Sequence, residues 1–197
     1  DPTRPIIGNA GFGQGEPGEV YDVHHYYGWN AASAIDWYAS FRNFLLAAEK
    51  VSKPLTLTEC VGAYTCDSGE FETMSKQLAT MLQWVGTATD VRTASLEYQA
   101  ELTRQIVEIG RRCRTDKSAV AGIFPFSYYL GWARAKKPED IIIKPAFEAL
   151  KVAFQPVLIS PECWHRNIYA GDTLRLRLCV ANDDDSGRDL APSQAVV

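Results

Sequence analysis

Short apolar runs alternate with longer helical patterns along the first 154 residues. Four of the runs are typical of buried strands, and they cover residues 6–10, 20–29, 54–59 and 120–126. Apolar residues spaced by three and four predict helices at about 33–48, 71–84, 94–113 and 145–154. A capping box from Ser33 to Asp36 begins the first helix, and Pro145 suits the first turn of the last. Strands that alternate with helices favour a parallel sheet with right-handed crossovers.

The pattern changes after residues 155–156. Residues 157–160 and 173–180 alternate with a period of two, and residues 171–172 and 183–187 have the composition of turns. These features predict antiparallel sandwich strands. We interpret the three aspartates in 183–187 as a solvated hairpin turn rather than a calcium loop, because the spacing of a calcium loop is absent. The chain therefore divides into two parts, 1–154 and 155–197.

The first part contains half of the strand–helix units of a closed barrel. A half barrel leaves two unpaired sheet edges, an exposure that natural domains avoid. For residues 1–154 we expect an open half barrel of four parallel strands with helices on one side, followed by a partial β-sandwich.

The composition is that of an ordinary globular protein, with 46% apolar residues and a net charge of −4. Nothing is basic enough for nucleic acid, and no apolar run approaches the length of a membrane span. The three His and five Cys lack a zinc-type spacing, so we expect no metal and no cofactor. Four arginines alternate with glutamates, and we interpret them as a solvated face: Arg104, Arg111, Arg112 and Arg114.

The strand at 54–59 ends on a carboxylate. Pro54 suits the first position of a strand, and Glu59 stands at the carboxyl end. The period of two puts Glu59 on the face of Leu55 and Leu57 unless a bulge intervenes. An acid there costs folding free energy unless something uses it, and in barrels of alternating strands and helices that end carries the chemistry. The competing interpretation is a surface glutamate in a strand-to-helix loop.

The strand at 20–29 runs into a polar and aromatic end that includes His24, His25, Tyr26 and Trp29. Aromatic faces stack on the apolar faces of sugars, so this end is a candidate ligand surface. Adjacent strand residues point to opposite faces, and the two histidines therefore cannot easily share one metal ion. The glycine-rich segment 11–18 lacks the lysine and helix start of a phosphate loop, and we interpret it as a barrel-top loop.

Five segments carry a family resemblance through their order and spacing. They are Asp1-Pro2-Thr3-Arg4-Pro5, His25-Tyr26-Tyr27-Gly28-Trp29, Lys53-Pro54 through Thr58-Glu59, Ala121-Gly122-Ile123 and Lys144-Pro145-Ala146-Phe147. Together they resemble glycoside hydrolase family 2, the family of β-galactosidases, β-glucuronidases and β-mannosidases. The resemblance covers about residues 1–154, and the tail resembles the immunoglobulin-like domain that follows the barrel in many members. It implies the C-terminal half of a (β/α)8 TIM barrel followed by a truncated immunoglobulin-like β-sandwich.

The resemblance also implies retaining hydrolysis of β-glycosidic bonds in a carbohydrate substrate. Glu59, at the end of what would be the seventh strand, matches the family's nucleophile. Tyr26, at the end of the sixth, matches the tyrosine that hydrogen-bonds that nucleophile. The family's general acid/base is a Glu that follows an Asn at the end of the fourth strand, upstream of this chain. The missing N-terminal half would then be needed for a complete barrel, and the fragment alone is expected to be inactive.

The candidate substrate contacts are His24, His25, Trp29, Phe126 and Trp132. Many family members carry a Trp near the position of Pro125-Phe126, so the sugar subsite differs here. Two other interpretations stay open. A non-catalytic carbohydrate-binding or scaffold protein could keep the barrel, whereas an upstream Asn-Glu pair would favour the enzyme. A flavodoxin-like binding domain would need a phosphate-cradling loop, which segment 11–18 does not supply.

Overall fold

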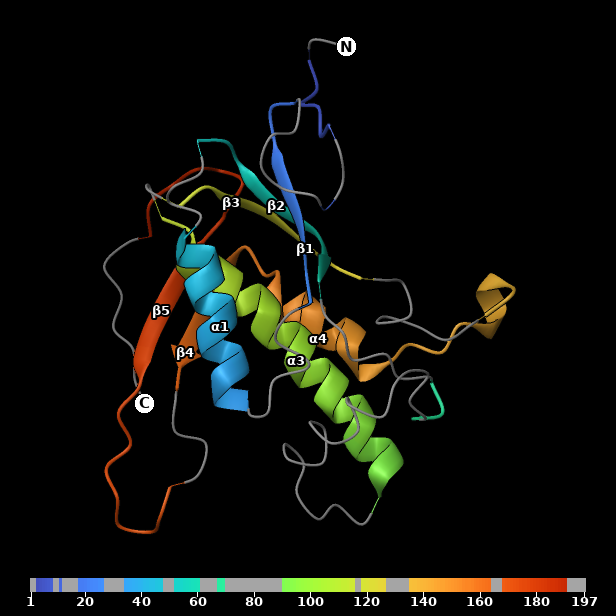
Figure 1. Ribbon diagram of the computed structural model, residues 1–197. Coiled ribbons are helices and arrows are strands. Elements are labelled where there is room, and N and C mark those ends of the chain that lie inside the picture. The colour runs from blue at the N-terminus through green and yellow to red at the C-terminus, as the bar shows by residue number, and fades with distance from the viewer. Residues whose placement is uncertain are drawn as a thin grey trace.

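The computed structural model describes residues 3–8, 11, 18–26, 34–47, 52–60, 67–69, 90–115, 118–126, 135–163 and 168–190. The helix expected at 71–84 lies outside these residues, as do Trp29 and Trp132. The described part is a mixed α/β structure with one parallel and one antiparallel sheet (Figure 1).

The parallel sheet has β2 at its centre. Its strands are β1 (Tyr21–His25), β2 (Leu55–Cys60) and β3 (Val120–Pro125), in the order β1-β2-β3. In the segment of the first expected strand, Ile7 forms a single parallel bridge with Val20, the residue directly before β1. Among the described residues, three strands and one bridge therefore stand in place of the four strands expected, and the sheet is open. The half barrel remains a prediction.

Three helices lie at positions that the sequence predicts, and they are α1 (Ala34–Ala47), α3 (Val91–Cys113) and α4 (Pro145–Ala153). The 3₁₀-helix η4 (Pro138–Asp140) was not expected. Asp90 caps α3 by accepting hydrogen bonds from the backbone N–H groups of Arg92 and Thr93, at 3.1 and 3.3 Å. Pro145 occupies the first turn of α4, where its missing N–H costs nothing.

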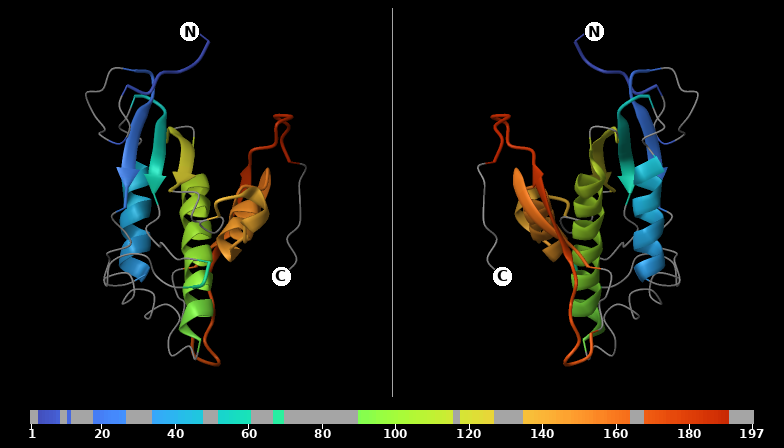
Figure 2. Two further views of the ribbon diagram at one scale, coloured as in Figure 1. Left: turned by 90° about the vertical axis from the view of Figure 1, so that its right-hand side faces the viewer. Right: turned by 90° about the vertical axis from the view of Figure 1, so that its left-hand side faces the viewer.

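The core lies between the sheet and the helices α1 and α3. Leu55 and Leu57 of β2 share one buried apolar cluster with Leu45 of α1 and with the apolar stripe of α3. Figure 2 shows α1 and α3 beside each other, with α4 and the tail on the far side of α3. At Gly110, α3 lies against the Ile123 side chain of β3, and a Cβ atom there would lie 1.8 Å from Cδ1 of Ile123. A larger residue at this position would therefore require the Ile123 side chain to move.

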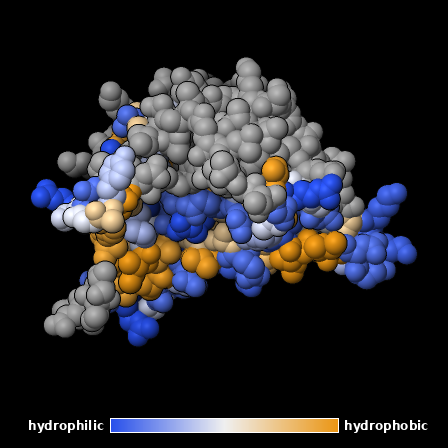
Figure 3. All heavy atoms as spheres, turned by 90° about the horizontal axis from the view of Figure 1, so that it is seen from below, coloured by the Kyte–Doolittle hydropathy of each residue, from blue (hydrophilic) through white to orange (hydrophobic). Residues whose placement is uncertain are grey.

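The tail forms an antiparallel pair of strands, β4 (Val157–Glu162) and β5 (Arg177–Asn182), which we call the tail ribbon. Alternate residues of β4 are buried, and these are Leu158, Ser160 and Glu162. Ile159 between them is exposed and pairs with Val180 of β5, which is exposed as well. Figure 3 shows apolar side chains gathered in two areas of the underside, with polar ones between them. The expected alternation is present, although β5 begins later than the pattern from residue 173 indicates.

Two of the arginines expected on a solvated face have side chains that are largely covered instead. Arg111 donates a hydrogen bond to the carbonyl oxygen of Ala153 at 2.6 Å. The Arg112 side chain is only 4% exposed, and its Nη1 lies 3.6 Å from Oε2 of Glu108 and donates to Oγ of Ser160 at 2.5 Å. The prediction of a solvated face is therefore wrong for these two residues. Alternating charges along α3 do not reveal that α4 and the tail ribbon cover its last turn and present acceptors that need donors.

Asp183, in the expected solvated turn, is likewise held by α3. Its carboxylate accepts hydrogen bonds from Arg111 at 3.1 Å and from Arg114 at 2.7 Å. Asp184 behaves as expected, since it accepts a hydrogen bond from the exposed N–H of Ser186 at 2.8 Å. Asp183 is nevertheless exposed, as a solvated turn predicts. No strand follows the turn among the described residues up to 190, so a hairpin at this place stays a prediction.

Candidate functional site

The Glu59 carboxylate lies at the carboxyl end of β2 between two side chains from the end of β1. The hydroxyl of Tyr26 donates a hydrogen bond to Oε2 of Glu59 at 2.9 Å. Nδ1 of His24 lies 3.2 Å from the same oxygen. The Glu59 side chain is 33% exposed, so the group is accessible from solvent while one of its oxygens is held in place. We call Glu59, Tyr26 and His24 the Glu59 group.

A bulge in β2 sets the direction of this carboxylate. Two consecutive residues of β1 pair with Leu57 and Glu59, which leaves Thr58 as an extra residue in β2. Leu55 and Leu57 are buried in the helix-facing core, and the next residue buried there is Cys60. Strict alternation would put Glu59 on the core face of β2, next to Leu57. Because of the extra residue, the Cys60 side chain is on that face instead. The bulge on which the sequence prediction was conditional is present, and Glu59 turns away from the face of Leu55 and Leu57.

The two neighbouring histidines have separate environments, as the period of two predicts. His24 faces Glu59, whereas the His25 ring stacks on Phe44 with a centroid distance of 4.1 Å and lies 5.3 Å from Phe41. Burial lowers the pKa of His25 to about 4, because the charged imidazolium is disfavoured there. This placement against α1 favours a packing role for His25, and its expected substrate contact stays a prediction.

An aromatic side chain that directly follows β3 completes the surroundings of Glu59. Phe126 meets the Tyr26 ring edge to face, with centroids 6.5 Å apart and an interplanar angle of 83°. Its backbone N–H donates to the carbonyl of Cys60 at 2.8 Å, so the contact between β2 and β3 continues past the end of β3. The structure thus brings Phe126 beside the Glu59 group, with 38% of the residue exposed. The other two expected aromatic contacts, Trp29 and Trp132, lie outside the described residues.

Three residues close to the group were not singled out from the sequence as site residues. They are Gly11, Asp22 and Thr58, which are joined by hydrogen bonds next to the bulge. Asp22 carried the one available signal, because a carboxylate within a short apolar strand requires buried donors. Gly11 and Thr58 carried none, since glycines are common in loops and threonine suits a regular strand.

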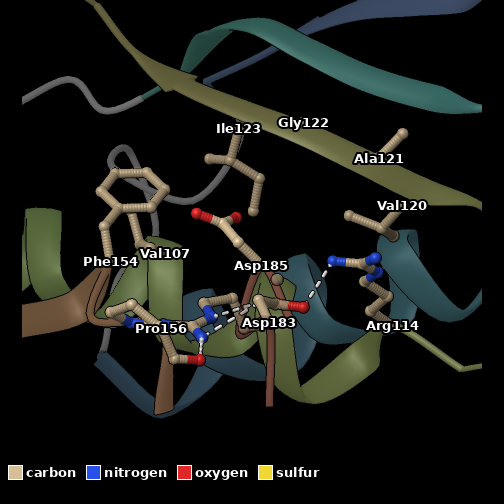
Figure 4. A pocket seen from close by; sticks show the side chains of 12 residues that line it. Val107, Arg114, Val120, Ala121, Gly122, Ile123, Phe154, Pro156, Asp183 and Asp185 are labelled. Atoms are coloured by element: carbon tan, nitrogen blue, oxygen red, sulfur yellow. Dashed lines mark hydrogen bonds and ion pairs between the residues drawn. The ribbon is translucent and has the colours of Figure 1, made fainter. Parts of the chain in front are cut away.

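A cavity of about 270 Å³ lies elsewhere, on the helix-covered side of β3 (Figure 4). Its lining includes Val120 at the beginning of β3, apolar side chains such as Phe154, and the ion pair of Arg114 with Asp183. No member of the Glu59 group lines it. Chemistry in α/β sheets is carried at the carboxyl ends of strands, so we place the candidate site at Glu59 rather than here.

The arrangement at Glu59 suits a nucleophile or a general base. Oε2 is held by Tyr26 and His24, whereas Oε1 has no hydrogen-bond partner among the residues that the structure describes. A carboxylate with one anchored oxygen and one available oxygen can attack an electrophilic carbon in a fixed direction. Across the described ranges no group of three or more metal-ligating side chains is found.

Comparison with protein-family models, with curated proteins and with solved structures finds no match to this chain. In the same described part of the chain, no helix is long and apolar enough to cross a membrane. Support for a function comes from the geometry around Glu59 and from the sequence resemblance.

Proposed function

We propose that this chain is part of a retaining glycoside hydrolase that cleaves β-glycosidic bonds, with Glu59 as the nucleophile. The observation that carries the proposal is the hydrogen bond from the Tyr26 hydroxyl to Oε2 of Glu59 at the carboxyl end of β2. A donor aimed at the carboxylate stabilises its charged form and fixes its orientation, which are the two requirements of a carboxylate nucleophile.

In this mechanism Oε1 of Glu59 attacks the anomeric carbon of the sugar. The bond to the leaving-group oxygen breaks while a second carboxyl group protonates that oxygen, and a glycosyl ester of Glu59 forms. Water then attacks the same carbon and gives its proton to the second carboxylate, while the ester bond to Glu59 breaks. This second displacement regenerates the Glu59 carboxylate and releases the sugar with its configuration retained. The two carboxyl groups of such enzymes lie about 5 Å apart.

The neighbours of Glu59 each have a part in this scheme. Tyr26 and His24 hold Oε2, so that Oε1 presents a lone pair to the sugar. Phe126 offers an exposed aromatic surface beside Tyr26 for the apolar face of a sugar ring. We place the second carboxyl group in the part of the barrel that precedes this chain. Loss of general acid assistance alone costs about 10²–10⁴-fold in rate, so the 197-residue chain should not hydrolyse aryl β-glycosides by itself.

The test uses the complete protein with its upstream half and a panel of aryl β-glycosides. Glu59→Gln should lower kcat by several orders of magnitude while sugar binding largely survives. A 2-fluoro glycoside should label wild-type protein, and peptide mapping should place the label on Glu59. In Glu59→Gly, added azide should restore cleavage and give the α-glycosyl azide. Glu148→Gln, a change of an exposed acid on α4, is the matched control and should keep the wild-type rate.

Three outcomes would contradict the proposal. A label on another acid, or a near-normal rate for Glu59→Gln, would exclude the nucleophile role of Glu59. A complete protein that binds sugars without hydrolysing any of the panel would favour the non-catalytic carbohydrate-binding alternative.

A further inference from the structure

We propose that Asp22 is a positioning residue for the Glu59 carboxylate, although the two side chains do not touch. The proposal rests on the function proposed above. Asp22 stands in β1 two residues before His24. It accepts two hydrogen bonds from Thr58, the bulge residue that directly precedes Glu59.

Asp22 is 1% exposed and its carboxylate is surrounded by hydrogen-bond donors. Oδ1 accepts from Oγ1 of Thr56 at 2.6 Å and from the backbone N–H of Thr58 at 3.2 Å. Oδ2 accepts from Oγ1 of Thr58 at 2.6 Å and from the backbone N–H of Gly11 at 2.8 Å. Burial of a carboxylate is costly without such donors, and these four contacts together offset that cost.

The first connection to Glu59 runs through the bulge. Thr58 is the extra residue of β2, and the regular ladder is interrupted at that residue. Its N–H and its hydroxyl both go to Asp22. Asp22 therefore satisfies the backbone group that the bulge takes out of the ladder, and it fixes the residue directly before Glu59.

The second connection runs through Gly11 and His24. Gly11 has a φ of +90° and donates its N–H to Asp22. It lies so close to the imidazole that a Cβ atom would be 2.5 Å from two ring atoms of His24. The backbone that Asp22 anchors thus packs against the His24 ring, whose Nδ1 faces Glu59. Both connections end on the same carboxylate.

An asparagine in place of Asp22 cannot reproduce these contacts. The amide offers one acceptor oxygen and one NH2 group where the carboxylate offers two acceptor oxygens. Each carboxylate oxygen serves one backbone N–H, that of Thr58 or that of Gly11, and a backbone N–H cannot become an acceptor. Either orientation of the amide therefore directs its NH2 group at one of them, whereas the threonine hydroxyls can rotate.

The experiment compares Asp22→Asn with a matched pair of valine variants in the complete protein. Thr56→Val and Thr58→Val each remove one hydroxyl donor from the same carboxylate, but only Thr58 is the bulge residue. We measure kcat and KM on an aryl β-glycoside, the rate of labelling by a 2-fluoro glycoside, the thermal midpoint, and hydrogen exchange in the peptide that contains Thr58.

Asp22→Asn should lower kcat and the labelling rate on the order of a hundredfold while KM changes by less than about threefold, as for a displaced nucleophile. Exchange at Thr58 should become faster. Thr58→Val should lower kcat about tenfold, and Thr56→Val should stay within about threefold of wild type, although the two lower the thermal midpoint alike. If Asp22 had only a structural role, two variants with equal thermal midpoints would also have equal kcat values.

Equal kcat values for Thr56→Val and Thr58→Val would overturn the positioning role, and this comparison remains decisive if Asp22→Asn does not fold. A wild-type kcat in folded Asp22→Asn would overturn it as well. Neither result touches the nucleophile assignment so long as Glu59→Gln is inactive in the same assay. If Glu59→Gln is active, the proposed function fails, and the positioning role of Asp22 for that reaction fails with it.

Discussion

Arg112 provides the sharpest test of how the tail is attached to the α/β part. Its guanidinium lies 5.5 Å from the centre of the Tyr38 ring and contacts the Tyr38 hydroxyl. It also lies 3.6 Å from Glu108, and it donates to Ser160 of the tail ribbon at 2.5 Å. The Arg112 and Glu108 side chains are 4% and 2% exposed. We therefore consider Arg112→Met, which keeps much of the side-chain volume and removes the charge and the donors.

The expected loss in the free energy of unfolding comes from Glu108, whose buried carboxylate loses the Arg112 guanidinium. Removal of one member of a buried ion pair typically costs about 3–5 kcal/mol, because the other charge stays buried. Glu108 keeps Arg104 at 2.5 Å and the hydroxyl of Ser160, so the lower end of the range applies. We expect Arg112→Met to lower the free energy of unfolding by about 3 kcal/mol. Glu108→Leu combined with Arg112→Met should recover most of this, since an apolar pair carries no buried charge.

Urea unfolding of the 197-residue chain, followed by circular dichroism, measures these differences. Lys151→Met is the control, because the Lys151–Glu148 pair is 60% and 61% exposed and such pairs are worth about 0–1 kcal/mol. A cost for Arg112→Met no larger than that of Lys151→Met would refute the buried network. A double variant as unstable as the single one would show that the lost free energy came from packing rather than from the stranded charge of Glu108.

Three further predictions concern single side chains. Tyr26→Phe in the complete protein should lower kcat/KM about tenfold to a hundredfold, because one hydrogen bond to the carboxylate is lost while the carboxylate remains; a loss as large as that of Glu59→Gln would contradict this. The pKa of His25 is lowered from 6.5 to about 4, so the unfolded chain takes up this proton first and the free energy of unfolding should fall as the pH drops from 6.5 to 4. That loss should be at most about 3 kcal/mol, and urea titrations at pH 7 and pH 4.5 should show His25→Phe to be less acid-sensitive than wild type. Burial raises the pKa of Cys60 to about 12, so iodoacetamide at pH 8 should alkylate the partly exposed Cys163 and Cys179 well before Cys60, as judged by peptide mass spectrometry.

The sequence was informative wherever one local rule decides the outcome. Apolar periodicity located β2, α3 and α4, because burial of one face is the main driving force for each element. The period of two separated His24 from His25, and the structure sends them to opposite faces. The position of Glu59 at a strand end could also be predicted, since it needs only the order of residues.

The contacts that orient the site could not be predicted in this way. Thr58 reads as an ordinary strand residue, and only the register between β1 and β2 reveals that it is extra. Asp22 could be suspected of needing donors, but its donors come from Gly11 and from β2, both distant in sequence. The burial of Arg112 depends on where the tail ribbon lies, which no charge pattern along α3 contains. Each of these depends on a pairing between segments, whereas periodicity describes one segment at a time.

The bulge in β2 makes the orientation of Glu59 depend on the pairing between two strands as well as on the local sequence. If β2 alternated strictly at its present length, the acid would face the apolar layer where Cys60 now lies. Deletion of Thr58 would remove the extra residue and leave Leu57, Glu59 and Cys60 in strict alternation, with the acid still directed away from that layer. Loss of the bulge therefore buries the acid only when the number of residues stays the same. Transfer of this site to another scaffold would accordingly require copying the pairing of β1 with β2 before any of the side chains.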